Sequence, residues 1–343
     1  MSDIKKRNEL LDFLRGFAII LVVFGHSIQY GSGANYSMDN FFNNIVVKII
    51  YSFHMPLFML ISGFLFYYAV SKRNFFEIVK SRFITLIIPI AIWTILFFVT
   101  LNLAKQNFSM LLNIKELIIT GLHTLWFLWA VFYCSFSVII IRKFFKDSII
   151  MYLLIFLVMF FIPNIFNFHL YSYMYPYFVV GYFYNKYEKK VQISKKMYTY
   201  VCIVSTVLYT VLTFFYNRDS YIYTSRYSIL GTNWSNQLLI DIYRTVIGFV
   251  GSIFVISLLK LIYPFLSKYI IEPVAKLGVN SLGLYVLSGY IATYVLPPLT
   301  SGLTGVNYWV ISLETVATIV FCYYFTELIK KSKIASFLLL GGR

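Results

Sequence analysis

Charged residues are scarce in this chain, and their scarcity excludes a soluble protein. Only 12% of the 343 residues are charged, whereas 60% are hydrophobic, and the mean hydropathy is +0.77. A soluble domain of this length could not bury so much apolar surface, so lipid must be its solvent. The composition therefore predicts an all-α, polytopic bundle that lies in the cell membrane and crosses it many times.

Metal ligands and the motifs of soluble enzymes are also missing. The three cysteines, Cys134, Cys202 and Cys322, each lie inside an apolar run and follow no metal-binding spacing. We therefore expect packed thiols and no metal site. The sequence has no Gly-rich phosphate loop and no serine nucleophile elbow. No permanently bound cofactor is expected.

Apolar runs long enough to cross the bilayer are abundant. About 20 helical residues span the hydrocarbon core, so runs of roughly 17–25 residues are candidates. Ten runs qualify, at 10–30, 45–70, 82–104, 122–142, 148–165, 170–185, 198–217, 237–262, 279–298 and 307–329. The sixth is short and rich in tyrosine. An even number of spans places both termini on the same side.

Acidic residues are few, with 13 Asp and Glu against 29 Lys and Arg, and the net charge is +16. With both termini in the cytoplasm, 22 of the 29 basic residues fall on the cytoplasmic side. The opposite side has only five, at Lys48, Lys105, Lys115, Arg218 and Arg226. The excess charge is therefore an insertion signal and a contact for anionic membrane lipid. A nucleic-acid partner is not expected.

Three polar residues, Asp12, Arg15 and His26, share one face of the first span and form a polar stripe along it. Arg15 and His26 are 11 residues apart, and 11 helical steps return to within about 20° of the starting direction while rising about 16 Å. Asp12 precedes Arg15 by three residues and can pair with it. Arg15 is then near the cytoplasmic boundary, with His26 about half the bilayer higher. A structural alternative is that Arg15 snorkels, Asp12 compensates its charge and His26 bonds a neighbouring helix.

Other polar residues enter the predicted spans. His54 and His123 fall in the outer half, as His26 does, and histidine can accept and return a proton near neutral pH. Glu314 lies well inside the tenth span, where a carboxylate is costly, so a functional or pairing role is favoured. Ser62, next to a glycine in the second span, is more typical of close helix packing than of chemistry.

Two further groups of charges have simpler explanations. Asp241 and Arg244 form an i,i+3 pair in the eighth span, and we expect them to neutralise each other. Lys80 and Arg82 open the third span on the cytoplasmic side. They are either ordinary positive flanking residues or the holders of a nucleotide-like donor's phosphates.

Four segments together resemble the membrane acyltransferase-3 family. They are "LDFLRGFAIILVVFGH" on the first span, "FHMPLFMLISGF" on the second, "LWFLWAVF" on the fourth and "VNSLGLYVLSGY" on the ninth. The family's most specific mark is a basic residue, ten intervening residues and a histidine, which Arg15 and His26 match. The resemblance implies one transmembrane domain over residues 1–343. It also implies an integral-membrane O-acyltransferase that acts on surface glycans.

The resemblance also suggests a catalytic group and a donor site. His26, Arg15 and Asp12 would be catalytic, with His26 serving as a general base on a sugar hydroxyl or forming a transient acyl-imidazole. Cytoplasmic acyl-CoA, by default acetyl-CoA, would be the donor. Members of the family carry two arginines three residues apart at the start of the third span.

Arg82 matches the first of these arginines, but Thr85 stands where the second would be. Lys80 and Arg73 are therefore further candidates for contact with the donor.

The acceptor would be a surface glycan or a lipid-linked sugar on the outer side. His54, Trp126, Ser62, Glu314 and His123 are the candidate acceptor-site residues. The chain stops soon after the tenth span, without the esterase-like domain of some relatives. We therefore expect direct transfer or a separate extracytoplasmic partner.

Two other function classes would also use a polar helix stripe. The first is a non-enzymatic polysaccharide translocase or export component. The second, a proton-coupled solute carrier, is disfavoured because the sequence shows no inverted repeat and no pair of Gly/Pro-broken helices.

Overall fold

Helices make up all the regular structure in the part of the chain that the computed structural model describes. That part covers residues 8–31, 39–106, 113–163, 165–188, 194–225, 233–300 and 306–342. Several basic residues used to predict the orientation lie outside it, namely Lys5, Lys6, Arg7, Lys189, Lys190, Arg226 and Arg343. The all-α prediction is confirmed for the described residues.

Eight helices are long and apolar enough to span a membrane. They are α1 (Glu9–Gly31), α3 (Ile45–Val70), the continuous run Phe75–Ala104, α7 (Trp126–Phe145), α10 (Lys195–Phe215), the run Trp234–Phe265, the run Ser281–Leu299 and α15 (Tyr308–Lys331). Each coincides with one of the ten predicted spans. The chain is thus a multi-pass membrane protein.

The fifth and sixth predicted spans form helices of a different kind. α8 (Ile149–Met159) is apolar but has only 11 residues, which is about 16 Å of helix. α9 (Phe168–Tyr187) has 20 residues, but its many tyrosines make it less apolar than the eight. Because α8 and α9 are consecutive, counting or omitting both leaves the number of spans even. The prediction that both termini lie on one side does not depend on them.

Three of the spanning runs are composite. The run Phe75–Ala104 consists of α4 (Phe75–Arg82), the π-helical turn η1 (Phe83–Ile87) and α5 (Ile88–Ala104). α11 (Trp234–Ile262) continues into η4 (Tyr263–Phe265), and α13 (Ser281–Tyr290) continues through η5 (Ile291–Val295) into α14 (Leu296–Leu299). The remaining helices are short: α2 (Asp39–Asn43), α6 (Ile114–His123), η3 (Arg218–Ser220), α12 (Lys268–Val279) and α16 (Lys333–Leu340).

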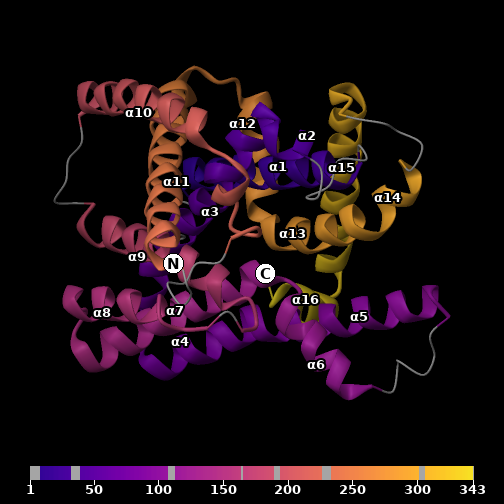
Figure 1. Cartoon of the computed structure of the whole chain (residues 1–343). Coiled ribbons are helices and arrows are strands. Elements are labelled where there is room, and N and C mark those ends of the chain that lie inside the picture. Colours follow the sequence, from indigo (N-terminus) through magenta and orange to yellow (C-terminus); the bar gives the residue numbers. More distant parts are fainter. Residues whose placement is uncertain are drawn as a thin grey trace. The chain divides into compact units, whose positions relative to one another are not determined.

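The chain divides into two units, and each draws on separate stretches of sequence. The first unit comprises residues 1–61, 192–216 and 247–324, and the second comprises 62–191, 217–246 and 325–343. In the first unit, α12 and α13 pack along α1 (Figure 1). In the second unit, α9 packs against α7 and α8, while α16 packs against α5 (Figure 1).

Glycine sets how closely α1 and α12 approach. A Cβ atom on Gly278 would lie 1.8 Å from the carbonyl oxygen of Asp12, and one on Gly16 would lie 1.8 Å from that of Val274. Neither position has room for a methyl group. The two backbones therefore touch directly, as small residues allow between membrane helices. This contact carries the start of α13 to the Asp12–Arg15 turn of α1.

Candidate active site

Asp12 and Arg15, the two residues of the polar stripe near the start of α1, belong to a small polar cluster inside the first unit. Arg15 Nη1 lies 3.7 Å from Asp12 Oδ1, as the i,i+3 spacing predicts. Arg15 Nη2 donates a hydrogen bond of 2.6 Å to Ser281 Oγ, the first residue of α13. Only 16% of the Arg15 side chain is exposed, so its guanidinium is directed into the unit by two partners. The Asp12–Arg15 pair that the structural alternative also expected is present.

His26 occupies the upper part of the same stripe. Its Nδ1 atom is buried and has no hydrogen-bond partner among the described residues. The ring meets Tyr30 edge-on, with 6.2 Å between ring centroids. A ring nitrogen that is buried without a partner costs stability, because it has lost water without gaining a hydrogen bond. Such a nitrogen can donate or accept a hydrogen bond, depending on the tautomer of the ring.

A second histidine lies within electrostatic reach of His26. His54 is buried in α3, and its Nδ1 is 2.7 Å from the carbonyl oxygen of Ile50. Since a carbonyl only accepts, Nδ1 carries the proton, and Nε2 is the accepting nitrogen of the neutral ring. The structure therefore brings together two of the three outer-half histidines that the sequence analysis selected.

Tyr51 ties α3 to α1 beside these rings. Its hydroxyl is 2.9 Å from Gln29 Oε1 and 3.2 Å from the carbonyl oxygen of Gly25, and its ring meets the His54 ring edge-on at 5.1 Å. Gly25 makes this approach possible, because a Cβ there would already lie 3.2 Å from the Tyr51 ring. Tyr51 and Gln29 were not predicted as site residues. The helical spacing of Gln29, three residues after His26, was the available signal.

Glu314 reaches the outer end of α1 from α15. A Cβ on Gly31, the last residue of α1, would lie 1.9 Å from Glu314 Oε2. Both carboxyl oxygens are buried, and neither has a hydrogen-bond partner within the described residues. Glu314 and His26 therefore both have buried polar atoms without described hydrogen-bond partners. Both lie within two turns of the C-terminal end of α1. The pairing alternative for Glu314 is not observed in the described part of the chain.

The donor-site candidates belong to the second unit, and they differ from one another. The Arg82 guanidinium carbon lies 4.9 Å from the centre of the Phe66 ring, and its Nε is buried without a described partner. Lys80 is exposed. Arg73 is also exposed and donates a hydrogen bond of 2.9 Å to Ser81 Oγ. Arg82 lies within electrostatic reach of Arg73.

Thr85 has a structural role at the position where the family's second arginine would stand. It lies in the π-helical turn η1, and its Oγ1 donates to the carbonyl oxygen of Ser81 at 2.8 Å. A Cβ on Gly341, which ends α16 at φ +68°, would lie 2.6 Å from Thr85 Cα. The end of α16 thus occupies this side of the turn, held also by Trp93 Nε1 bonding the carbonyl oxygen of Leu339 at 2.9 Å.

Three acceptor-site candidates also belong to the second unit. Trp126 begins α7 and meets the Tyr223 ring edge-on at 6.0 Å. His123 ends α6 and is exposed, with Nδ1 3.3 Å from Asn167 Oδ1. Ser62 precedes Gly63, where a Cβ would lie 2.0 Å from the carbonyl oxygen of Phe178 in α9. The packing interpretation therefore explains this Ser-Gly pair.

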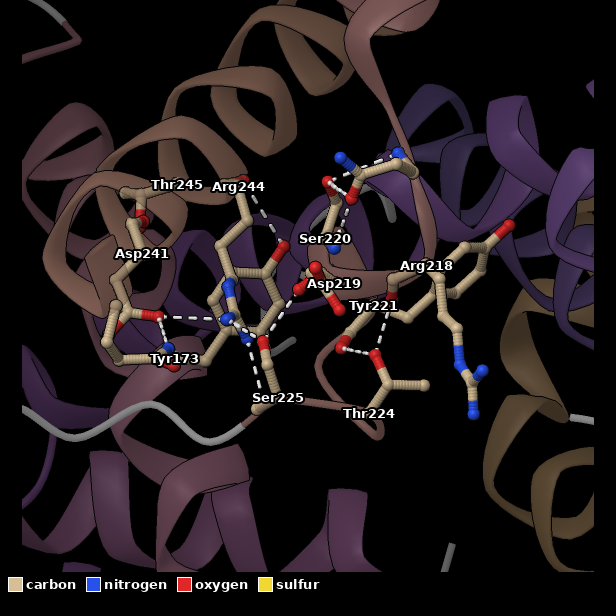
Figure 2. Close-up of polar contacts among 12 residues, drawn as sticks. Tyr173, Arg218, Asp219, Ser220, Tyr221, Thr224, Ser225, Asp241, Arg244 and Thr245 are labelled. Carbon is tan, nitrogen blue, oxygen red and sulfur yellow. Dashed lines mark hydrogen bonds and ion pairs between the residues drawn. The ribbon is translucent and has the colours of Figure 1, made fainter. Parts of the chain in front are cut away.

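The Asp241–Arg244 pair is confirmed and has an additional function in the fold. Arg244 is 1% exposed, and its Nη2 lies 3.0 Å from Asp241 Oδ1. The guanidinium also binds the carbonyl and hydroxyl oxygens of Ser225, so it holds the segment between α10 and α11 (Figure 2). In that segment, burial raises the pKa of the Tyr221 hydroxyl, which therefore stays protonated.

Comparison with known proteins places these features in a family. A family model described as an acyltransferase domain matches residues 8–327. Two curated relatives are Nodulation protein NolL of Sinorhizobium fredii and of Mesorhizobium japonicum. The first is 39% identical over 130 residues, which is 36% of this chain and 34% of the relative. The second is 34% identical over 148 residues, which is 42% of this chain and 38% of the relative.

The matched stretch thus spans little more than a third of either curated relative. No solved structure matches the chain. The family match, however, runs from the residue before α1 into the last turns of α15, and it includes the Asp12–Arg15–His26 stripe. The chain therefore belongs to the membrane acyltransferase-3 family.

Proposed function

We propose that this protein transfers an acyl group, by default acetyl, from cytoplasmic acyl-CoA to a hydroxyl of a surface or lipid-linked glycan. The proposal rests on the arrangement of polar groups at the two ends of the stripe along α1. At one end, Arg15 is oriented by Asp12 and Ser281. At the other end, about 16 Å higher, His26 keeps a buried ring nitrogen free of described partners.

A polar stripe through the membrane would connect the two substrates of this reaction, which lie on opposite sides of the bilayer. Acyl-CoA is made in the cytoplasm and cannot cross a bilayer, whereas the sugar is outside or on a lipid carrier. A polar route through hydrocarbon is costly and is kept where function requires it. Arg15 would hold the thioester arm of the donor on the inner side, and Arg82, Lys80 and Arg73 are the second-unit candidates for its phosphates.

His26 would carry the proton of the reaction. As a general base, it takes the proton of the sugar hydroxyl while the hydroxyl oxygen attacks the thioester carbonyl. The C–O ester bond forms, the C–S bond breaks, and the proton passes to the departing CoA thiolate. In the alternative route, the ring nitrogen itself attacks and an acyl-imidazole then passes the group to the sugar. His54 and Glu314 would bind the acceptor hydroxyls nearby.

The remaining candidates would serve the outer acceptor side. Trp126 offers an aromatic face of the kind that packs against sugar rings. His123 would contribute a polar contact, whereas packing accounts for Ser62. A separate extracytoplasmic partner would be needed only if the purified chain transfers the acyl group from CoA but cannot modify the glycan itself.

The decisive experiment uses the full-length protein in lipid nanodiscs with radiolabelled acetyl-CoA and an outer-surface glycan fraction. The wild-type protein should release CoA and label the glycan with an alkali-labile ester. His26→Ala should reduce turnover by about 10²–10⁴, the usual value of general acid–base help. His169→Gln, a histidine substitution outside the stripe, should retain activity. Near-normal transfer by His26→Ala would exclude the proposed role.

A further inference from the structure

A basic surface pocket lies in the second unit, between α4 and the end of α7. It has a volume of about 200 Å³ and is lined by Arg73, Arg142, Lys143 and Phe75, with three aliphatic side chains completing the wall. Its sequence neighbours, the connection after α3 and the end of α7, are predicted to face the cytoplasm. No carboxylate is among the lining residues. A pocket with three cations and no anion attracts a negatively charged ligand.

The cations that line the pocket still have N–H groups that can donate hydrogen bonds to such a ligand. Within the described residues, Arg142 makes one hydrogen bond, in which Nη1 donates to the Tyr182 hydroxyl at 3.2 Å. Arg73 likewise makes one, to Ser81. A guanidinium has five N–H donors in a planar fork, so most of each fork is available to bind phosphate oxygens. Lys143 Nζ lies 5.9 Å from the centre of the Phe75 ring and adds a mobile point charge.

The nearest acidic group is already neutralised. Asp147 follows α7 and accepts a hydrogen bond of 2.9 Å from Lys186 Nζ. It also accepts from the Tyr152 and Tyr182 hydroxyls, each at 3.0 Å. Asp147 also lies within electrostatic reach of Arg142, but these three groups share its charge. Tyr182 forms hydrogen bonds with both Arg142 and Asp147, and these bonds fix the Arg142 guanidinium at the rim of the pocket.

We propose that Arg73, Arg142 and Lys143 form a binding site for clustered phosphate groups, and that these are the phosphates of the CoA donor. This assignment rests on the proposed function. The pocket is smaller than the roughly 300–1,000 Å³ that a whole drug-sized ligand fills, so it suits the phosphates rather than the entire donor. Arg142 and Lys143 were interpreted from the sequence as insertion signals and lipid contacts. In this proposal they bind the donor together with Arg73, whereas Lys80 and Arg82 do not line the pocket.

The test measures ligand binding separately from acyl transfer. The full-length protein is placed in nanodiscs of neutral lipid, and the dissociation constants for CoA and for adenosine 3′,5′-bisphosphate are measured by calorimetry. Arg142→Gln/Lys143→Gln should weaken both ligands roughly 10- to 100-fold, since two charge-assisted contacts are lost. The matched control is Lys268→Gln/Lys276→Gln, which removes two exposed cations of the first unit and should leave both constants unchanged.

The outcomes separate the pocket from the proposed function. Equal CoA affinity in all three proteins would overturn the pocket assignment, and the proposed function would stand if transfer is intact. Bisphosphate binding that depends on Arg142 and Lys143 without any acyl transfer would support the phosphate site and refute the proposed function. A third arm repeats the measurement in nanodiscs with anionic phospholipid. If the pocket variants lose only lipid binding, the phosphate comes from a lipid headgroup and the CoA assignment is wrong.

Discussion

Glu314 is buried at a cost to stability, and we propose that it binds the acceptor. Its two carboxyl oxygens are buried and lack hydrogen-bond partners in the described part of the chain. Glutamine has nearly the same shape and no charge, so Glu314→Gln removes the cost of burying an unpaired carboxylate. We expect an unchanged or higher unfolding temperature together with a loss of about one to two orders of magnitude in acyl transfer.

Scanning fluorimetry and a turnover assay on the same preparation check this prediction. Glu327→Gln is the matched control on α15, because Glu327 forms a partly exposed pair with Lys330 at 3.2 Å. Exposed pairs contribute about 0–1 kcal/mol, so neither measurement should change much. A lower unfolding temperature for Glu314→Gln with full activity would show that Glu314 is only structural.

At the scale of the element, the contact between α1 and α12 determines the position of Arg15. Gly278→Ala would place a methyl group 1.8 Å from the carbonyl oxygen of Asp12, so the two helices must separate. Overpacking of this kind costs about 1–3 kcal/mol. The separation also withdraws Ser281 from Arg15, so activity should fall together with the unfolding temperature.

Gly289→Ala provides the control for this substitution. Gly289 lies in α13, and a Cβ there meets nothing within 4 Å. Alanine is the better helix former by about 1 kcal/mol, so this variant should be as stable as the wild type or more stable. Thermal unfolding in detergent compares the two variants. Equal stability of Gly278→Ala and Gly289→Ala would contradict the close contact.

The same elements show what the sequence can and cannot predict. The Asp12–Arg15 and Asp241–Arg244 pairs were predicted because i,i+3 spacing is a local property of a helix, and both are present. The bond from Arg15 to Ser281 was not predicted, since it joins residues 266 positions apart. Small residues in "VNSLGLYVLSG" indicated packing but not which helix they face.

The basic pocket between α4 and α7 was missed for a related reason. Arg142 and Lys143 fit the positive-inside rule, which accounts for where cations fall along the chain but not for which of them converge. Only the packing of α4 against α7 places Arg73 beside them.

At the scale of the whole molecule, the open question is how often the chain crosses the bilayer. An α8 of 11 residues is about 16 Å long, shorter than the hydrocarbon core of about 30 Å, while α9 is long enough but rich in tyrosine. The segregation of basic residues requires that α8 and α9 either both cross or both stay on the inner side, because Arg142, Lys143 and Lys146 precede α8 and Lys186 lies at the end of α9.

Labelling of introduced cysteines with a membrane-impermeant maleimide decides this point. The native thiols of Cys134, Cys202 and Cys322 are buried and give a low background. Ile165, between α8 and α9, is 54% exposed, so Ile165→Cys should react in intact cells if the pair crosses. Lys268→Cys, on the predicted cytoplasmic side, should react only after permeabilisation. Reaction of Ile165→Cys only after permeabilisation would mean that α8 and α9 stay on the inner side and that eight helices cross. Reaction of Lys268→Cys in intact cells would reverse the predicted orientation, and with it the assignment of Arg15 to the donor side and of His26 to the acceptor side.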